Sequence, residues 1–141
     1  MNHKDYLITI DGAQHREDYK DTVSMSTVGR YWRENDLFFI SYDESAATGF
    51  EGDVTSLMIE ADKKVTMSRQ GSSNTQLIIE CGRRHLSHYN TMFGGFTVGI
   101  NADKIQNSLG ENGGELKLCY SLDLNASDLS VNELNITVKE I

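Results

Sequence analysis

The chain has 141 residues, the usual length of one domain, and we expect residues 1–141 to fold as a single unit. Acidic residues outnumber basic ones by 21 to 13, and the basic residues form no run. Nucleic acid and anionic membranes are therefore not expected as partners. No stretch approaches the ~18 apolar residues of a membrane span. Together with only two cysteines, Cys81 and Cys119, expected to stay reduced, this predicts a soluble cytoplasmic protein.

Apolar and polar residues alternate with period two along much of the chain. In chain order this pattern predicts strands within residues 6–10, 23–27, 65–67, 96–100, 115–124 and 134–138. The pattern is clearest in ELKLCYSLDL, residues 115–124, where a helix could not place every second side chain on one face. Turn-forming segments follow the runs: DES, ADKK, QGSSN, CGRR, FGG, GENGG and NASD. These breaks predict about ten strands in an antiparallel meander.

An all-β fold is therefore expected, and we favour a single antiparallel up-and-down barrel of about 8 to 10 strands. Joining the first strand to the last would remove exposed sheet edges. The alternative is a two-sheet sandwich. For residues 100–110 the sequence allows either a short helix or one long bent strand, because Ile105 and Leu109 also fit a helical spacing. Tyr31 and Trp32 either plug one end of the barrel or belong to a subunit contact.

The segment ECGRRHLSHYNTMFGG, residues 80–95, gathers polar side chains between glycines. If GRRH closes a tight hairpin, Glu80 faces Ser87 across the two strands. In any register one strand face carries four polar residues, His85, Ser87, Tyr89 and Thr91.

The order of four motifs resembles the YwiB-like family of small bacterial calycin, or lipocalin-like, barrels without an assigned function. These motifs are DLFFISYDES with a later TG, KVTMSRQG, GRRHLSHYNTMFGG with a later VGI, and GENGGELKLCYSLDLN. The similarity runs from about residue 5 to the end and implies a lipocalin-like barrel. The matched polar and glycine positions are Tyr42, Glu44, Ser45, Arg69, Gly71, Arg84, His85, Ser87, Tyr89, Thr91 and Gly94. The sequence departs from the family pattern at Met92, where a proline is common, and at Phe93, where a tyrosine is common.

Arg69 continues the apolar face of Val65 and Met67, so the alternation points its guanidinium inward, where an unpaired charge is unfavourable. One interpretation is a ligand site inside the barrel, in which Arg69 holds an anion or carboxylate. The other is a structural ion pair with Glu44 or Glu80, or bonds to backbone carbonyls.

Catalytic and metal sites have weaker support. Glu80, His85 and Ser87 could serve as orienter, base and nucleophile of a hydrolase, but no nucleophile elbow accompanies them. His85 and His88 point to opposite sides of a strand, and the cysteines have no paired-ligand spacing. We expect no enzyme activity, no metal and no cofactor.

Two functions remain. The first is a binding barrel for a small anionic or amphipathic molecule. The expected contacts are Arg69, Tyr42, Glu44, His85, Ser87, Tyr89 and Thr91. The second is a filled barrel without a ligand that acts through its outer surface, as a homodimer or as an accessory to another protein. A cavity above ~300 Å³ beside Arg69 would favour the first.

Overall fold

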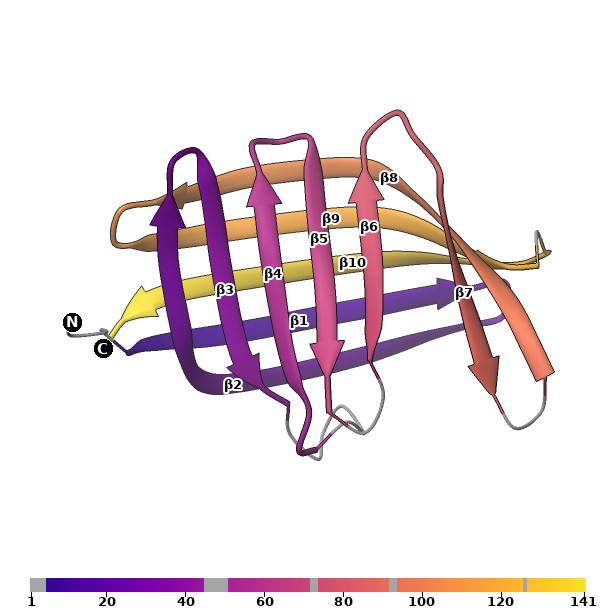
Figure 1. Ribbon diagram of the computed structural model, residues 1–141, viewed down its shortest axis with the longest axis horizontal. Coiled ribbons are helices and arrows are strands. Elements are labelled where there is room, and N and C mark those ends of the chain that lie inside the picture. Colours follow the sequence, from indigo (N-terminus) through magenta and orange to yellow (C-terminus); the bar gives the residue numbers. More distant parts are fainter. Residues whose placement is uncertain (1–4, 45–50, 72–73, 92–93, 126) are drawn as a thin grey trace.

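The computed structural model describes residues 5–44, 51–71, 74–91, 94–125 and 127–141, and these residues form ten antiparallel strands (Figure 1). The strands are β1 (Tyr6–Arg16), β2 (Tyr19–Glu34), β3 (Leu37–Asp43), β4 (Val54–Glu60), β5 (Lys64–Gln70), β6 (Thr75–Glu80), β7 (His85–Thr91), β8 (Gly94–Gly110), β9 (Gly113–Leu124) and β10 (Ser127–Glu140). No helix that could cross a membrane occurs in the described part of the chain.

The ten strands make one nearly closed barrel, as the sequence predicts. Their order is β6-β5-β4-β3-β2-β1-β10-β9-β8-β7, so every strand except β6 and β7 pairs with both of its neighbours in sequence, and the first strand also pairs with the last. The remaining opening lies between β6 and β7. Residues 100–110 belong to the long strand β8, with a register shift between Ala102 and Lys104, so the helical alternative is wrong.

Strand β2 connects two layers of the barrel that cross each other steeply (Figure 1). Its first part pairs with β1, up to Gly29, and its last five residues pair with β3, beginning at Arg30. A side chain at Gly29 would overlap the side chain of Ile8 and the carbonyl oxygen of Ser41. Glycine is therefore required where β2 leaves one layer and enters the other.

The interior is built from inward-facing side chains of strands in both layers. Ile8, Ile40, Ile59, Ile100 and Ile136 are fully buried and come from both layers. Burying branched apolar side chains from crossing strands supplies the main stabilisation of such a fold.

The two aromatic residues of uncertain placement take opposite positions. Tyr31 is buried, its ring lies 5.3 Å from that of Tyr6, and its hydroxyl donates to the carbonyl of Gly110 at 2.5 Å. Trp32 points outward and stacks on Phe39, with ring centroids 5.2 Å apart. Tyr31 thus packs in the interior, whereas Trp32 lies on the surface.

The expected hairpin of β6 and β7 does not form. Strand β7 pairs with β8 instead, placing Ser87 opposite Val98, and the end of β6 forms only an isolated bridge, Glu80 with Arg83, to the turn before β7. The predicted pairing of Glu80 with Ser87 is therefore wrong. Strand β7 has a long partner in β8, and its ladder with β8 directs it away from β6 beyond the turn (Figure 1).

Candidate functional site

A hollow of about 510 Å³ lies inside the barrel between the two layers. Strands β1, β2 and β10 form one side of it, and β3, β5 and β9 contribute residues from the other directions. The lining residues are apolar and polar, and Ala13, Thr22 and Glu133 among them belong to the outward face of their strands: Ile10, Gly12, Ala13, Gln14, Asp21, Thr22, Val23, Met25, Tyr42, Glu44, Met67, Arg69, Tyr120, Asn132, Glu133 and Leu134. Three of the seven predicted ligand contacts, Tyr42, Glu44 and Arg69, are therefore brought together here.

Arg69 lies on the inward face of β5, as its position after Val65 and Met67 predicts. Its Nη2 lies 3.6 Å from Oε1 of Glu44, and its Nε donates to Oγ1 of Thr55 at 3.3 Å. Thr55 in turn donates to Oε1 of Glu44 at 2.6 Å. The interior charge is thus paired with Glu44, one of the two carboxylates considered from the sequence, and Glu80 lies elsewhere.

Thr55 was not predicted as a site residue, although it holds the cluster together. It is fully buried on β4, opposite both Tyr42 on β3 and Arg69 on β5. The one available signal was its place on the inward face of β4 two residues before Leu57, where a polar residue needs a hydrogen-bond partner. Which residues become the partners of Thr55 depends on the strand register, which is set only in the folded sheet.

The polar cluster is shielded from water. The Glu44 side chain is only 2% exposed, whereas that of Arg69 is 23% exposed and borders the hollow. A carboxylate in such surroundings is stable because it is matched by an opposite charge and by the Thr55 hydroxyl.

Two tyrosines contribute hydroxyl groups to the hollow. Burial raises the pKa of Tyr42 far above its ordinary value, and the neighbouring Glu44 carboxylate raises it further against the opposing effect of Arg69. Burial also raises the pKa of Tyr120, again opposed by Arg69. Both hydroxyls therefore stay protonated at neutral pH and can donate hydrogen bonds. Tyr120 belongs to the alternating run of residues 115–124 and was not among the predicted ligand contacts.

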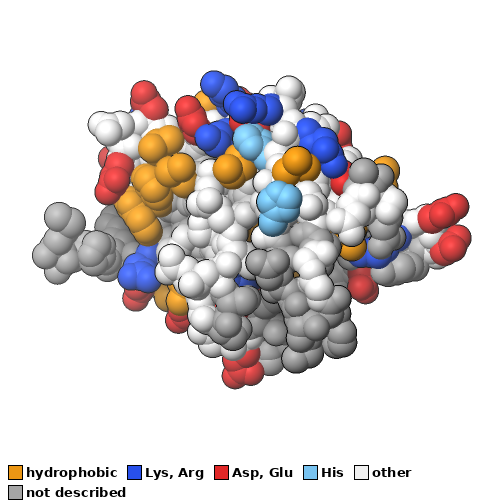
Figure 2. Space-filling view, turned by 45° about the vertical axis from the view of Figure 1, so that its right-hand side comes forward, with side chains coloured by type: hydrophobic (Ala, Val, Ile, Leu, Met, Phe, Trp, Pro, Cys, Tyr) orange, Lys and Arg blue, Asp and Glu red, His pale blue; other side chains and the backbone are white. Residues whose placement is uncertain are grey.

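His85 and Ser87 lie at the opening between β6 and β7 and do not line the hollow. His85 Nε2 is 2.7 Å from Glu80 Oε1, and this hydrogen bond lowers the pKa of the Glu80 carboxyl. Ser87 donates to the backbone carbonyl of Gln76 at 3.2 Å. Among the described residues His85 and Ser87 share no hydrogen bond. Figure 2 shows this side of the molecule, with histidine, basic and apolar side chains interspersed.

The remaining two predicted contacts, Tyr89 and Thr91, have side chains outside the described part of the structure. Within the described part, no three His, Cys, Asp or Glu side chains gather as metal ligands would.

A family model described as "Domain of unknown function (DUF1934)" matches residues 8–136. The chain belongs to the DUF1934 family. The crystal structure of the YwiB protein from Bacillus subtilis matches with a TM-score of 0.84 at 16% sequence identity, covering 99% of this chain and 93% of that one. No curated protein matches. The resemblance to YwiB-like barrels is confirmed, and this DUF1934 chain shares their fold within a family of unknown function.

Proposed function

We propose that this DUF1934 barrel binds a small amphipathic molecule in its interior hollow. The observation that carries the proposal is a single space of about 510 Å³ in which an apolar wall faces a polar cluster formed by Arg69, Glu44 and Tyr42. Sites for small molecules are typically hollows of roughly 300–1,000 Å³ with mostly apolar walls and a few convergent polar groups.

The apolar part of the ligand would lie along Ile10, Val23, Met25, Met67 and Leu134. These side chains come from β1, β2, β5 and β10, so the wall belongs to the rigid sheet rather than to loops. A site on strands holds its geometry better than a site on loops.

The charges favour a neutral polar head over an anion. Two carboxylates, Asp21 and Glu44, line the hollow beside a single guanidinium, whereas the Glu133 carboxylate is directed outward to His15. Glu44 already balances Arg69 at 3.6 Å, so an anionic head would meet a surplus of negative charge. A hydroxyl, carbonyl or amide could accept from Arg69 and from the protonated hydroxyls of Tyr42 and Tyr120. Of the two ligand classes expected from the sequence, the amphipathic one is retained.

Fluorescence titration of the full chain with N-phenyl-1-naphthylamine, a neutral apolar probe, tests the proposal. Met67→Trp narrows the hollow, and Met58→Trp on the outward face of β4 is the matched control. We expect the probe to bind, Met67→Trp to weaken it about tenfold, and Met58→Trp to leave it unchanged. Decanol should displace the probe better than decanoate. Absence of binding, or equal loss in two variants that circular dichroism shows to be folded, would refute the proposal.

A second candidate function is supported by the outer surface. Trp32, Phe39, Met58 and Ile78 lie on one line across β2, β3, β4 and β6, and Trp32 is 39% exposed. Such a line of apolar side chains is typical of an interaction surface, as the homodimer or accessory alternative requires. Sedimentation velocity of the native chain and of Trp32→Glu distinguishes it. A dimer that the substitution dissociates would favour this function.

Hydrolysis by Glu80, His85 and Ser87 gains no support. The hydroxyl hydrogen of Ser87 is directed to the Gln76 carbonyl, and a serine nucleophile requires a hydrogen bond to its base.

A further inference from the structure

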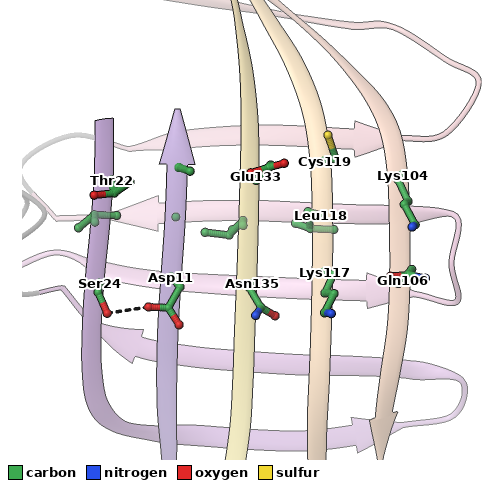
Figure 3. A pocket seen from close by; sticks show the side chains of 14 residues that line it. Asp11, Thr22, Ser24, Lys104, Gln106, Lys117, Leu118, Cys119, Glu133 and Asn135 are labelled. Carbon is green, nitrogen blue, oxygen red and sulfur yellow. Dashed lines mark hydrogen bonds between the residues drawn. The ribbon is translucent and has the colours of Figure 1, made fainter. Parts of the chain in front are cut away.

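A second hollow, of about 540 Å³, lies on the outward face of the layer formed by β1, β2, β8, β9 and β10 (Figure 3). Two rows of side chains cross these five strands in register. The first row is Ser24, Asp11, Asn135, Lys117 and Gln106, and the second is Thr22, Ala13, Glu133, Cys119 and Lys104. The interior hollow lies on the opposite face of the same strands.

The hollow exists because small residues stand beside long ones. Ala13 occupies the second row between Thr22 and Glu133, and its side chain is the shortest in that row. Lysine, glutamine and glutamate side chains rise on the strands that follow in the layer (Figure 3). The outward face of a sheet is thereby hollowed in its middle.

The charges around this hollow are separated by sign. The carboxylates belong to Asp11 on β1 and Glu133 on β10, whereas the ammonium groups belong to Lys117 on β9 and Lys104 on β8. Neighbouring strands lie about 4.8 Å apart, so Asp11 and Lys117, like Glu133 and Lys104, are separated by about 10 Å across the sheet. The hollow has an acidic side and a basic side.

Two of the lining groups lack partners. Lys104 forms no ion pair within the described part of the chain. The Oδ1 atom of Asn135 is buried and accepts no hydrogen bond from the described residues. Asn135 lies between Asp11 and Lys117 in the first row, near the boundary of the two sides. A buried acceptor without a donor is unfavourable.

The other charged groups have only solvent-exposed partners. Lys117 Nζ lies 3.2 Å from Glu115 Oε1, and His15 Nε2 lies 3.3 Å from Glu133 Oε2. Asp11 accepts from the Ser24 hydroxyl at 2.6 Å. Exposed ion pairs are weak and exchange readily for a ligand.

We propose that this outer hollow binds a small zwitterion whose carboxylate lies toward Lys104 and Lys117 and whose ammonium group lies toward Asp11 and Glu133. A single molecule with both charges complements both sides, whereas an anion or a cation alone would meet repulsion from one side. The two hollows share strand segments around Gly12, Thr22 and Glu133, but the charged groups of this site lie on the outward face and suit a ligand of a different class.

Nuclear magnetic resonance titrations of the full chain with three matched probes test this proposal. The probes are 6-aminohexanoate, which carries both charges, hexanoate, which carries only the negative one, and hexylammonium, which carries only the positive one. We expect 6-aminohexanoate to shift the backbone amide signals of Asp11, Lys104 and Glu133 and to bind about tenfold more tightly than either singly charged probe. Equal affinities for the three probes, or shifts confined to other strands, would overturn it.

Substitutions of lining residues test whether 6-aminohexanoate binds in the outer hollow. Lys104→Gln and Glu133→Gln should each weaken 6-aminohexanoate about fivefold, since each removes one charge partner. Ala13→Leu should abolish binding by filling the hollow. Lys139→Gln, an exposed site near the end of β10 outside the hollow, is the charge-matched control and should bind like the native chain. Native affinity in both Lys104→Gln and Glu133→Gln would contradict the proposal. The interior probe, N-phenyl-1-naphthylamine, reports separately on the other hollow.

Discussion

Arg84 reaches over strand β8 to pair with Asp123 on β9. Its Nη2 lies 2.8 Å from Oδ1 of Asp123 and 3.0 Å from Oδ2. The guanidinium passes directly over Gly99, where any side chain would overlap both the Arg84 guanidinium and the Asp123 carboxylate. This pair fixes the chain just before β7 to β9 across β8, at the place where β7 separates from β6.

Gly99→Ala should therefore break the pair between Arg84 and Asp123. We expect a loss of about 1 kcal/mol in the free energy of unfolding, the upper range for a partly exposed ion pair. Urea denaturation of Gly99→Ala, Arg84→Gln and the double variant checks this. The two substitutions should not add, because they remove the same interaction. Additive losses would mean that Gly99 matters for another reason.

Thr55→Val should destabilise the barrel by about 1 to 3 kcal/mol, because it removes the hydroxyl that bridges Arg69 and Glu44 and leaves buried polar atoms without a partner. Thr66→Val on β5 is the matched control. Thr66 is also shielded but faces outward, opposite Met58, and its substitution should change stability by less than about 0.5 kcal/mol. Equal effects of the two substitutions in thermal and urea unfolding would argue against the bridging role.

Because of the raised pKa of Tyr31, we expect the protein to lose stability in alkaline solution. Burial, reinforced by Tyr6 and opposed by Arg33, raises the pKa of Tyr31 from 10.0 to about 12. The folded state thus favours the protonated hydroxyl, and this contribution is complete below pH 10 and is lost as the pH rises toward 12. The free energy of unfolding of the native chain should fall more steeply over this range than that of Tyr31→Phe. Parallel pH profiles of the two proteins would contradict the assignment.

The contact between Glu80 and His85 predicts an acid-dependent effect. The hydrogen bond from His85 lowers the pKa of Glu80 below 4.5, so its stabilising contribution is present above pH 4.5 and is lost as the pH falls through the lowered value. Carbon-13 resonance titration should show the Glu80 pKa returning toward 4.5 in His85→Gln. His88→Gln is the control, because His88 bonds to Thr97 instead. An unchanged Glu80 pKa in His85→Gln would mean that another group lowers it.

Part of the interior cluster could be predicted from the sequence, because side-chain direction in a strand is a local property. The alternation of Val65, Met67 and Arg69 places the guanidinium inside without knowledge of any partner. The same rule put Leu116 and Leu118 in the core, where both are buried. Glu44 was named as a partner for Arg69, and the two residues meet.

Thr55 and Tyr120 could not be assigned to the cluster in this way. Their roles depend on which strands face each other across the interior, and many registers are compatible with one alternating pattern. The outer hollow also depends on strand pairing and register, since its two rows contain residues from five strands that are distant in sequence.

The sequence by itself determined the all-β class, the inward and outward faces of the strands with regular alternation, and the inward direction of Arg69. These follow from the geometry of an extended backbone, which every strand has alone. Only the tertiary structure decided that β7 pairs with β8 rather than β6, and hence that His85 and Ser87 lie apart from Arg69. Strand partners are chosen by the closure of the whole sheet, in which β1 and β10 must also meet, and no local segment carries that information.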